Sequence, residues 1–321
     1  MEYASEVLKI ALSETVVVLK VLNIWHFAPN AAKLLHEWEQ SEFFVPRTPQ
    51  EQVMWRRAQN AYKKVLAFYR IWSIICVLLA FLSVVFMETP QLPVPYWIPV
   101  KKWREGNGWP LYLYDFVAVI FTCCCNIEID SLQCYYLLHL TLCLRLIGLR
   151  MARLEDAGDN VEITSELLKL IQMQQRVKDM VKRCEEIVSL PVLVQIIFSS
   201  MIICFTAYYL QSLSFSNNPA DFVAMVQYGF VMSLQIFLPC YYANELTAES
   251  LNLSKQLYSC NWTDMSAYNR RLIYLYMQDL KQPIALRAGS YFEIGLQVFS
   301  KTMNNAYTLL ALLANVADED E

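Results

Sequence analysis

The sequence predicts an all-α membrane protein, a single bundle of helices that cross the membrane several times. Of the 321 residues, 56% are hydrophobic and only 17% are charged, whereas about 25% of a typical soluble chain is charged. The apolar residues also gather in runs of about 20, the length that crosses a hydrocarbon core of about 30 Å. The chain has only 7 glycines, too few for a glycine-rich nucleotide-binding fold or a turn-rich β protein.

Six membrane-crossing helices are expected, and the whole chain, residues 1–321, forms one domain. The first is the least apolar, because Lys9, Glu14 and Lys20 lie among its Val, Leu and Ile residues. The second contains no charge from Ile71 to Met87. The six helices are predicted at residues 5–28, 66–88, 111–145, 187–213, 222–246 and 288–316.

The third predicted helix is long enough to cross the membrane and project beyond it, although Asp115, Glu128 and Asp130 interrupt it. A charge at such a depth costs about 2.5–3.5 kcal/mol on insertion scales. We therefore expect Glu128 and Asp130 to face protein or water. The fourth and fifth helices are uncharged over most of their length, and the last carries only Glu293 and Lys301.

The polar intervals between these helices alternate in their Lys and Arg content. Residues 29–65, 146–186 and 247–287 are rich in both. Residues 88–110 have only Lys101, Lys102 and Arg104, and residues 214–221 and the C-terminal tail have neither. Lys and Arg concentrate in cytoplasmic loops, so the three basic intervals are predicted to be cytoplasmic. Met1 and the C-terminus should then both lie outside, in a multi-pass membrane protein.

The cytoplasmic intervals have helical patterns. From Glu162 to Val188, apolar residues recur every three or four positions, which predicts an amphipathic helix that runs into the next membrane segment. Leu246–Leu280 shows a similar pattern with a break near Asn261. We expect a packed cytoplasmic helical anchor region where subunits could meet; the alternative is a set of solvated helical loops.

The interval from Glu88 to Pro110 differs from the others because it is rich in Pro, Trp and Tyr. Proline cannot continue a helix, so this interval is predicted to be an ordered external loop. Its aromatic side chains suit the membrane interface, and a lid over a binding cavity is the alternative.

Several classes of function are excluded. The net charge of −4 gives no reason to expect a nucleic-acid partner. The 10 cysteines are spread too widely for a disulfide scaffold. The sequence has no Ser-His-Asp set, CxxC pair, HExxH sequence or P-loop. No enzyme activity, cofactor or metal site is therefore expected.

An ordered series of motifs fills the chain from Gln235 onward. It consists of QIFLPCYYANEL (235–246), YSCNW (258–262), RRLI (270–273), QPIALRAG (282–289), FEIGLQVF (292–299) and AYTLLALL (306–313). This series resembles the insect odorant receptors, a seven-helix family unrelated to G-protein-coupled receptors, and the resemblance covers nearly the whole chain. The family's inverted topology matches the predicted orientation. By comparison with the family, this chain should lack the first helix, with six of seven present.

The resemblance implies a role in olfaction. The compact interval 146–186 and the ending TLLALLAN (308–315) favour the odorant-tuning subunit over the shared co-receptor. The chain is thus expected to form a ligand-gated, non-selective cation channel, a heterotetramer with an odorant co-receptor in olfactory sensory neurons. Its other partners would be a small volatile odorant and membrane lipid, and the resemblance implies that it is a multi-pass protein of the plasma membrane. A gustatory receptor of the sister family, a G-protein-coupled receptor and a transporter are the alternatives.

An odorant is small and mostly apolar, so its site should be an apolar cavity with one or two hydroxyls. The resemblance places this cavity between the first, second, third and fifth helices, in the outer half of the membrane. For every candidate, ordinary helix packing or lipid contact is the alternative interpretation. The candidates are Ala11, Thr15, Val18, Ile75, Leu78, Leu79, Leu82, Phe116, Ile120, Cys123, Gln227, Tyr228 and Val231.

The resemblance also implies that the last helix lines the pore. Leu309, Leu312 and Val316 are spaced at three and four, so they share one helical face. A ring of such residues blocks ions because a narrow apolar constriction cannot replace their hydration shell. Asn315 lies beside this face. The four acids at residues 318–321 would attract cations to the outer mouth, or form a solvated tail.

Overall fold

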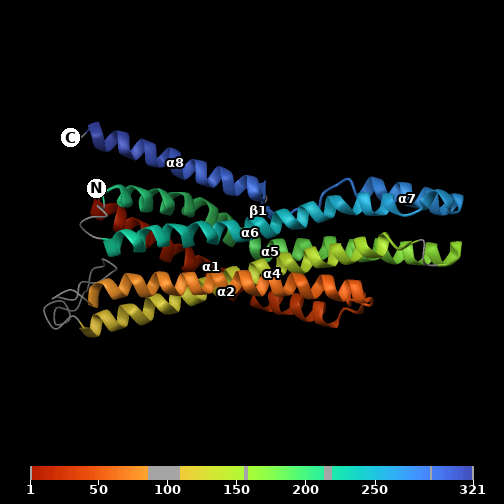
Figure 1. Ribbon diagram of the computed structural model, residues 1–321, viewed down its shortest axis with the longest axis horizontal. Helices are drawn as coiled ribbons and strands as arrows, with labels where there is room; N and C mark the ends of the chain where they lie inside the picture. The colour runs from red at the N-terminus through yellow and green to blue at the C-terminus, as the bar shows by residue number, and fades with distance from the viewer. Residues whose placement is uncertain (1, 86–108, 155–157, 213–218, 290, 320–321) are drawn as a thin grey trace.

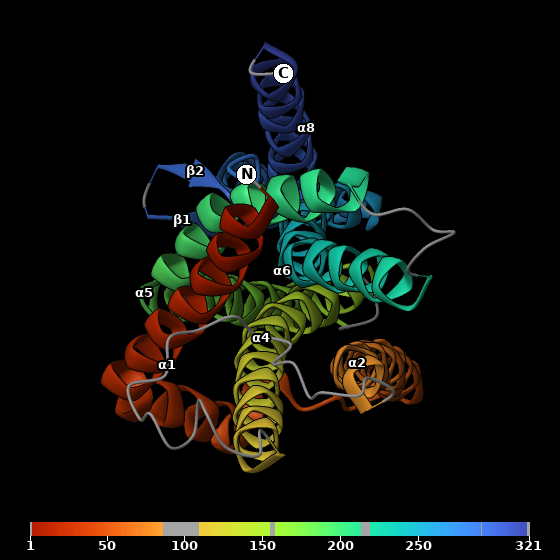
Figure 2. The same ribbon diagram turned by 90° about the vertical axis from the view of Figure 1, so that its left-hand side faces the viewer.

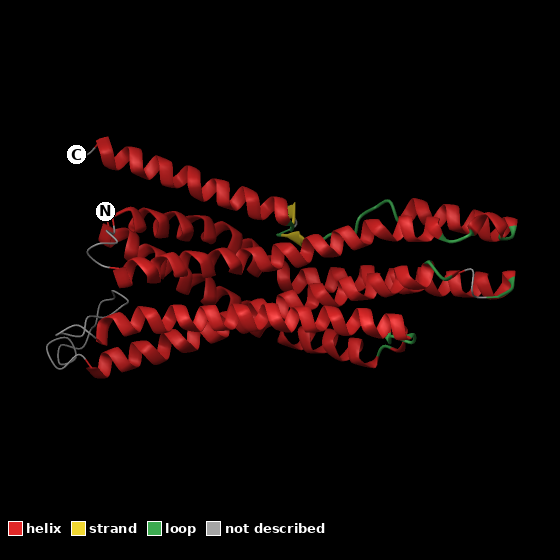
Figure 3. Cartoon of the chain, in the orientation of Figure 1, coloured by secondary structure: helices red, strands yellow, loops and turns green. Residues whose placement is uncertain are grey.

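The computed structural model describes residues 2–85, 109–154, 158–212, 219–289 and 291–319. Within these residues the chain has seven α-helices and one two-stranded hairpin, arranged as an elongated bundle (Figures 1 and 3). The predicted all-α fold is confirmed. Within the described residues, four helices are long and apolar enough to cross a membrane: α2, α4, α5 and α6.

The elements follow one another in a simple order. The helices and strands are α1 (Glu2–Gln40), the 3-10 turn η1 (Glu42–Phe44), α2 (Pro49–Val85), α4 (Trp109–Met151), α5 (Asn160–Ser212), α6 (Pro219–Ser259), the 3-10 turn η3 (Trp262–Asp264), α7 (Ala267–Asp279), β1 (Arg287–Ala288), β2 (Phe292–Glu293) and α8 (Leu296–Glu319).

Single helices continue through the predicted boundaries between membrane and cytoplasmic parts. The predicted amphipathic helix at 162–188 is confirmed as the first half of α5, which runs on to Ser212. The predicted break near Asn261 is also confirmed. There α6 ends at Ser259, and α7 begins after Ser266, whose hydroxyl accepts a hydrogen bond from the Asn269 amide at 3.2 Å.

The last helix begins later than the sequence predicts, at Leu296 rather than at residue 288. The intervening residues form the β1–β2 hairpin, in which Ala288 pairs with Phe292. The chain turns at Gly289, whose φ of 58° suits glycine and does not occur in a right-handed helix. The Ile294 amide then donates to the Leu286 carbonyl at 2.8 Å, which closes the hairpin away from the helical path.

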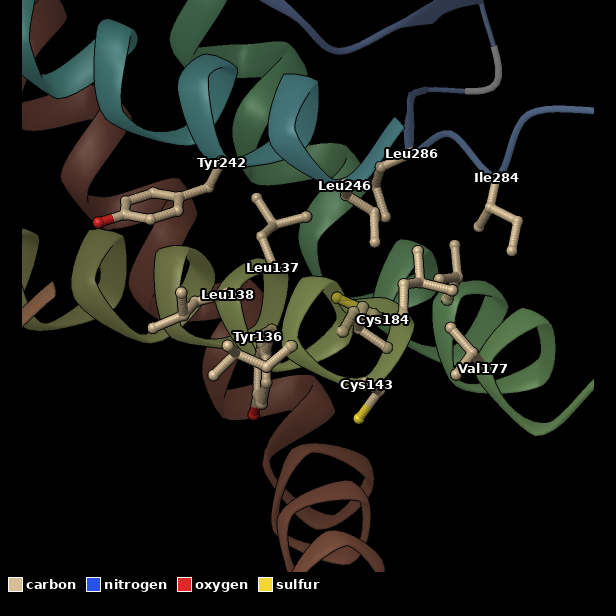
Figure 4. Packing of buried hydrophobic residues seen from close by; sticks show 14 of the residues in the cluster. Tyr136, Leu137, Leu138, Cys143, Val177, Cys184, Tyr242, Leu246, Ile284 and Leu286 are labelled. Carbon is tan, nitrogen blue, oxygen red and sulfur yellow. The ribbon is translucent and has the colours of Figure 1, made fainter. Parts of the chain in front are cut away.

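The largest buried cluster lies where α4, α5 and α6 meet in the middle of the molecule. Leu137 of α4, Cys184 of α5 and Leu246 of α6 converge there with Leu286 from the chain before β1 (Figure 4). All four side chains are 0% exposed. Burying a side chain of this size from water stabilises a fold by about 1.5–3 kcal/mol. This cluster joins the long helices into one body.

Both termini lie at the same end of the bundle (Figure 1). Viewed from that end, α8 lies at the edge of the bundle, and α4 occupies the centre (Figure 2). The end with the termini also receives the start of α4 and the end of α5. The predicted external loop at 88–110 lies largely outside the described residues. The extracellular position of both termini stays a prediction.

Candidate functional site: a cavity among four helices

A cavity of about 200 Å³ lies between α1, α2, α4 and α6, in the half of the molecule that carries both termini. Most of its wall is apolar, with Val17, Val77, Phe81, Ile127 and Val231 contributed by the four helices. A closed cavity of about 150 Å³ is large enough to bind benzene. The space therefore suits a molecule of one ring or a short chain.

One end of the cavity carries a group of polar side chains from α1 and α6. The Lys9 ammonium lies 3.1 Å from the sulfur of Met225 and 4.3 Å from the centre of the Tyr209 ring. One turn along α1, the Ser13 hydroxyl donates to the Lys9 carbonyl at 2.8 Å. The Ser13 oxygen also lies 2.7 Å from the Tyr228 hydroxyl. Since the Ser13 proton is used on the carbonyl, Tyr228 is the donor in this second contact.

The opposite end, away from the termini, rests on a buried network of charged and amide groups. Lys20 of α1 donates to Asp130 of α4 at 2.6 Å, and the two side chains are 0% and 2% exposed. Lys20 also donates to the Asn126 oxygen at 2.9 Å, which Gln235 of α6 approaches at 3.2 Å. Tyr69 of α2 donates to the second Asp130 oxygen at 3.3 Å. The four helices around the cavity are thus tied together at its floor.

The structure places the predicted ligand contacts in two groups. Cys123, Tyr228 and Val231 line the cavity. The candidates on α1 and α2 lie on faces that do not line the cavity. The Phe116 ring packs on the Phe81 ring, with the ring centroids 5.1 Å apart. The side-chain amide of Gln227 donates to the Trp72 carbonyl at 3.2 Å. The candidates outside the cavity lining are Ala11, Thr15, Val18, Ile75, Leu78, Leu79, Leu82, Phe116, Ile120 and Gln227.

The four helices that line the cavity are the ones that the resemblance implied, but the inward faces of α1 and α2 differ from the predicted ones. Hydropathy does not separate a lipid-facing side from a protein-facing side, because lipid tails are as apolar as leucine. Polar and small residues do mark the inward face: Ser13 on α1, and Ser73, Cys76 and Ala80 on α2. The spacing of Ser73, Cys76 and Ala80 at three and four is the signal in the sequence that would have identified the inward face of α2.

The last helix presents one side to the bundle and one side to its surroundings. Thr302 and Ala306 are each 3% exposed, whereas Leu309 is 38% and Leu312 57% exposed. The predicted gate residues Leu309 and Leu312 therefore lie on the outward side. The side chains of Asn315 and Val316 lie outside the described residues. In a membrane protein an apolar face of this kind contacts lipid or another helix.

The described residues hold no group of three His, Cys, Asp or Glu side chains placed to bind a metal ion. The cysteines are all free thiols, including the run from Cys123 to Cys125 beside the cavity. Of these, Cys123 contributes to the apolar wall, a role that suits a small polarisable side chain.

Comparison with known proteins identifies the family. A family model described as 7tm Odorant receptor matches residues 1–307. Odorant receptor 94a of Drosophila melanogaster is 37% identical over 318 residues, which cover 99% of this chain and 82% of that receptor. Odorant receptor 46a, isoform A, of the same fly is 27% identical over 326 residues, with 98% and 84% covered.

The fold also matches a solved receptor. The insect olfactory receptor OR5 from Machilis hrabei, in complex with eugenol, superimposes with a TM-score of 0.87 at 19% identity, over 98% of this chain and 82% of that one. The relatives are receptors, not enzymes. Together with the four described helices that are long and apolar enough to cross a membrane, these matches make the protein a multi-pass membrane receptor. The chain belongs to the insect 7tm odorant receptor family.

Proposed function

We propose that this chain is the odorant-binding subunit of a ligand-gated, non-selective cation channel. It forms this channel as a heterotetramer with an odorant co-receptor, in the plasma membrane of olfactory sensory neurons. The single observation that carries the proposal is the apolar cavity enclosed by α1, α2, α4 and α6. Its size and apolar wall suit a small volatile molecule. The receptor of the same fold from Machilis hrabei was solved with eugenol, a molecule of that class.

A direct contact between helices supports a route from the cavity to the pore. Gln235 on α6 lines the cavity, and two residues further along the same helix Phe237 packs on Phe299 of α8. The ring centroids are 5.4 Å apart and the rings meet edge to face. A ligand that fills the cavity changes the preferred packing of α6 and, through this contact, the position of α8.

The outward face of α8 supports a role in the gate. Leu309 and Leu312 present apolar side chains away from their own subunit. Four such helices around an axis form an apolar constriction that excludes hydrated ions until it widens. In this proposal the chain contributes its α8 beside those of the co-receptor, and ligand binding dilates the ring.

Whole-cell recording tests this function. Cells that express the chain with an insect odorant co-receptor should give inward cation current when a panel of neutral volatiles is applied. Cells with the co-receptor alone, or with this chain alone, are the controls and should give no response to the same ligands. A chain that reaches the surface together with the co-receptor and yet responds to no member of a broad panel contradicts the proposal.

The alternative functions receive less support. The family match favours neither a G-protein-coupled receptor nor a transporter, and it names odorant rather than gustatory receptors. A response that needs G-protein signalling and persists without any co-receptor would favour a G-protein-coupled receptor.

A further inference from the structure

Asn126 of α4 lies at the floor of the cavity, between the ligand space and the buried ion pair. It lines the cavity together with Ile127 and Gln235. Its side-chain oxygen accepts two hydrogen bonds, from the Lys20 ammonium at 2.9 Å and from the Gln235 amide at 3.2 Å. The residue therefore belongs to both the cavity wall and the Lys20–Asp130 network.

These two contacts fix which way the Asn126 amide points. An ammonium group has three donors and no acceptor, so the atom that faces Lys20 must be the oxygen of Asn126 and not its nitrogen. The nitrogen, with its two N–H donors, is turned to the other side. Among the described residues, no acceptor forms a hydrogen bond with the Asn126 side-chain nitrogen. This nitrogen is also not fully enclosed by protein atoms. The cavity is the space that Asn126 lines.

The network also strengthens this donor. Lys20 is fully buried and held by Asp130 at 2.6 Å, so its position relative to Asn126 is fixed. A cation that binds the oxygen of an amide polarises the group and makes its N–H a better donor. The neighbouring wall, with Cys123, Val231 and Met232, is of low polarity, so a hydrogen bond formed there is little weakened by water.

We propose that the Asn126 side-chain N–H group is the hydrogen-bond donor for the ligand, and that the cavity selects small apolar molecules carrying a carbonyl oxygen, namely ketones, aldehydes or esters. The assignment rests on the proposed ligand role of the cavity and adds the chemical class of the ligand. The hydroxyls at the other end are less suited, because Ser13 and Tyr228 already bond to each other and to the Lys9 carbonyl. A carbonyl oxygen supplies the acceptor that Asn126 lacks without bringing a donor of its own.

A matched pair of probes tests this assignment on the purified full chain in lipid nanodiscs. The probes are 2-heptanone and 2-methyl-1-heptene, which share size and shape but differ in the accepting oxygen. Binding is measured as the rise in unfolding temperature with probe concentration. In the wild type the ketone should reach half-saturation at a concentration about tenfold lower than the alkene, the value of one net hydrogen bond.

Two substitutions at Asn126 should remove this preference. In Asn126→Asp the oxygen that Lys20 and Gln235 need is kept, the N–H donors are lost, and a negative charge is added near Asp130. In Asn126→Leu the oxygen and the donors are both lost without a change of charge. The unfolding temperature of each variant without probe shows whether it folds, and either variant that folds gives the test. Cys124→Val is the matched control, because it changes an exposed position of the same helix that does not line the cavity; its preference for the ketone should persist.

Two results would overturn the assignment: equal binding of the two probes to the wild type, or a ketone preference that is unchanged in both Asn126 variants. The second result would place the ligand oxygen at the Lys9 and Ser13 end. Recordings with the co-receptor separate this from the proposed function. An Asn126-dependent ketone preference in a chain that gives no current supports the donor assignment and contradicts the channel subunit. Current evoked equally by both probes supports the channel subunit and contradicts the donor assignment.

Discussion

At the residue scale, the ion pair between Lys20 and Asp130 is the feature with the largest expected effect on stability. The pair is enclosed by protein: Tyr69 donates a hydrogen bond to Asp130, and Asn126 accepts one from Lys20 and a second from Gln235. Removing one partner leaves the other charge without compensation in a medium of low polarity, which costs about 3–5 kcal/mol. Lys20→Met should therefore lower the unfolding temperature of the purified protein markedly, and should reduce the fraction that reaches the cell surface.

Two further variants show whether the effect comes from the unpaired charge. The double variant Lys20→Met with Asp130→Leu removes both charges and should recover much of the loss. Glu166→Gln breaks the exposed Lys169–Glu166 pair, whose side chains are 55% and 44% exposed, and should cost less than about 1 kcal/mol. A Lys20→Met protein as stable as the wild type would show that the pair does not hold the helices.

Glu51 gives the expected dependence of stability on pH. Burial by itself would raise the pKa of Glu51, but hydrogen bonds from the Arg150 guanidinium and the Arg47 amide outweigh it and hold the pKa below its ordinary value of 4.5. A carboxyl whose folded-state pKa is lowered stabilises the fold above the unfolded-state pKa. That stabilisation is complete above about pH 4.5 and is lost as the pH falls through the folded-state pKa.

The measurement is a series of thermal unfolding curves from neutral pH down to acid pH. Glu51→Gln should be less stable than the wild type at neutral pH, by about 1–3 kcal/mol for lost charge-assisted hydrogen bonds. The difference between the two proteins should shrink below pH 4.5, because the wild type loses the same interaction there. A difference that stays constant over the whole range would contradict the assignment.

Some of this residue-scale detail follows from the sequence alone. The cost of charge in a membrane predicts that Asp130 faces protein, and it does. Its partner Lys20 was not predicted, because the two residues lie far apart in the chain. Their pairing depends on how α1 and α4 are rotated against each other, and the apolar residues around both helices give no measure of that rotation.

At the element scale, α8 is the helix whose two sides differ most in their surroundings. Leu312 lies on the outward side, and Leu310 is half-buried toward the bundle. If the outward side closes the pore, Leu312→Ala weakens the apolar barrier and should raise the leak current without ligand. Whole-cell recording of the heteromer measures that current. Val316→Ala should act in the same way, and Asn315→Asp should change ion preference rather than ligand preference.

Leu310→Ala is the matched control on the same helix, and it should change the leak current less than Leu312→Ala. Wild-type leak, conductance and selectivity in both Leu312→Ala and Val316→Ala would mean that this subunit's α8 does not form the gate. The co-receptor's helices alone would then control the pore.

The helices themselves were largely predictable, but their ends were not. Charge-free runs located α2, α5 and α6, and the spacing of apolar residues located the first half of α5. The start of α8 was missed, because residues 288–295 carry a single charge, Glu293, and lead directly into the apolar run that follows. The hairpin there depends on the backbone conformation of Gly289 and on the hydrogen bond from Ile294 to Leu286, which hydropathy does not detect.

At the scale of the whole molecule, the orientation in the membrane follows from the alternation of Lys and Arg between intervals. Asn252 and Asn261 occupy glycosylation sequons near the end of α6, in the half away from the termini. If that half is cytoplasmic, both should remain without sugar, and an epitope added after Glu321 should be stained on intact cells. Sugar on either asparagine, or an epitope that is stained only after permeabilisation, would reverse the orientation.

The central claim is that the cavity among α1, α2, α4 and α6 is where the odorant acts. The most direct measurement compares two substitutions on α6 in cells that also express the co-receptor. Val231→Trp fills the cavity from its wall, whereas Val226→Trp adds the same side chain at a position 46% exposed on the outside. For any volatile that activates the wild type, Val231→Trp should abolish the evoked current without loss of surface labelling, and Val226→Trp should preserve the response. Normal ligand-evoked current in Val231→Trp would contradict the claim and move the odorant site elsewhere in the receptor.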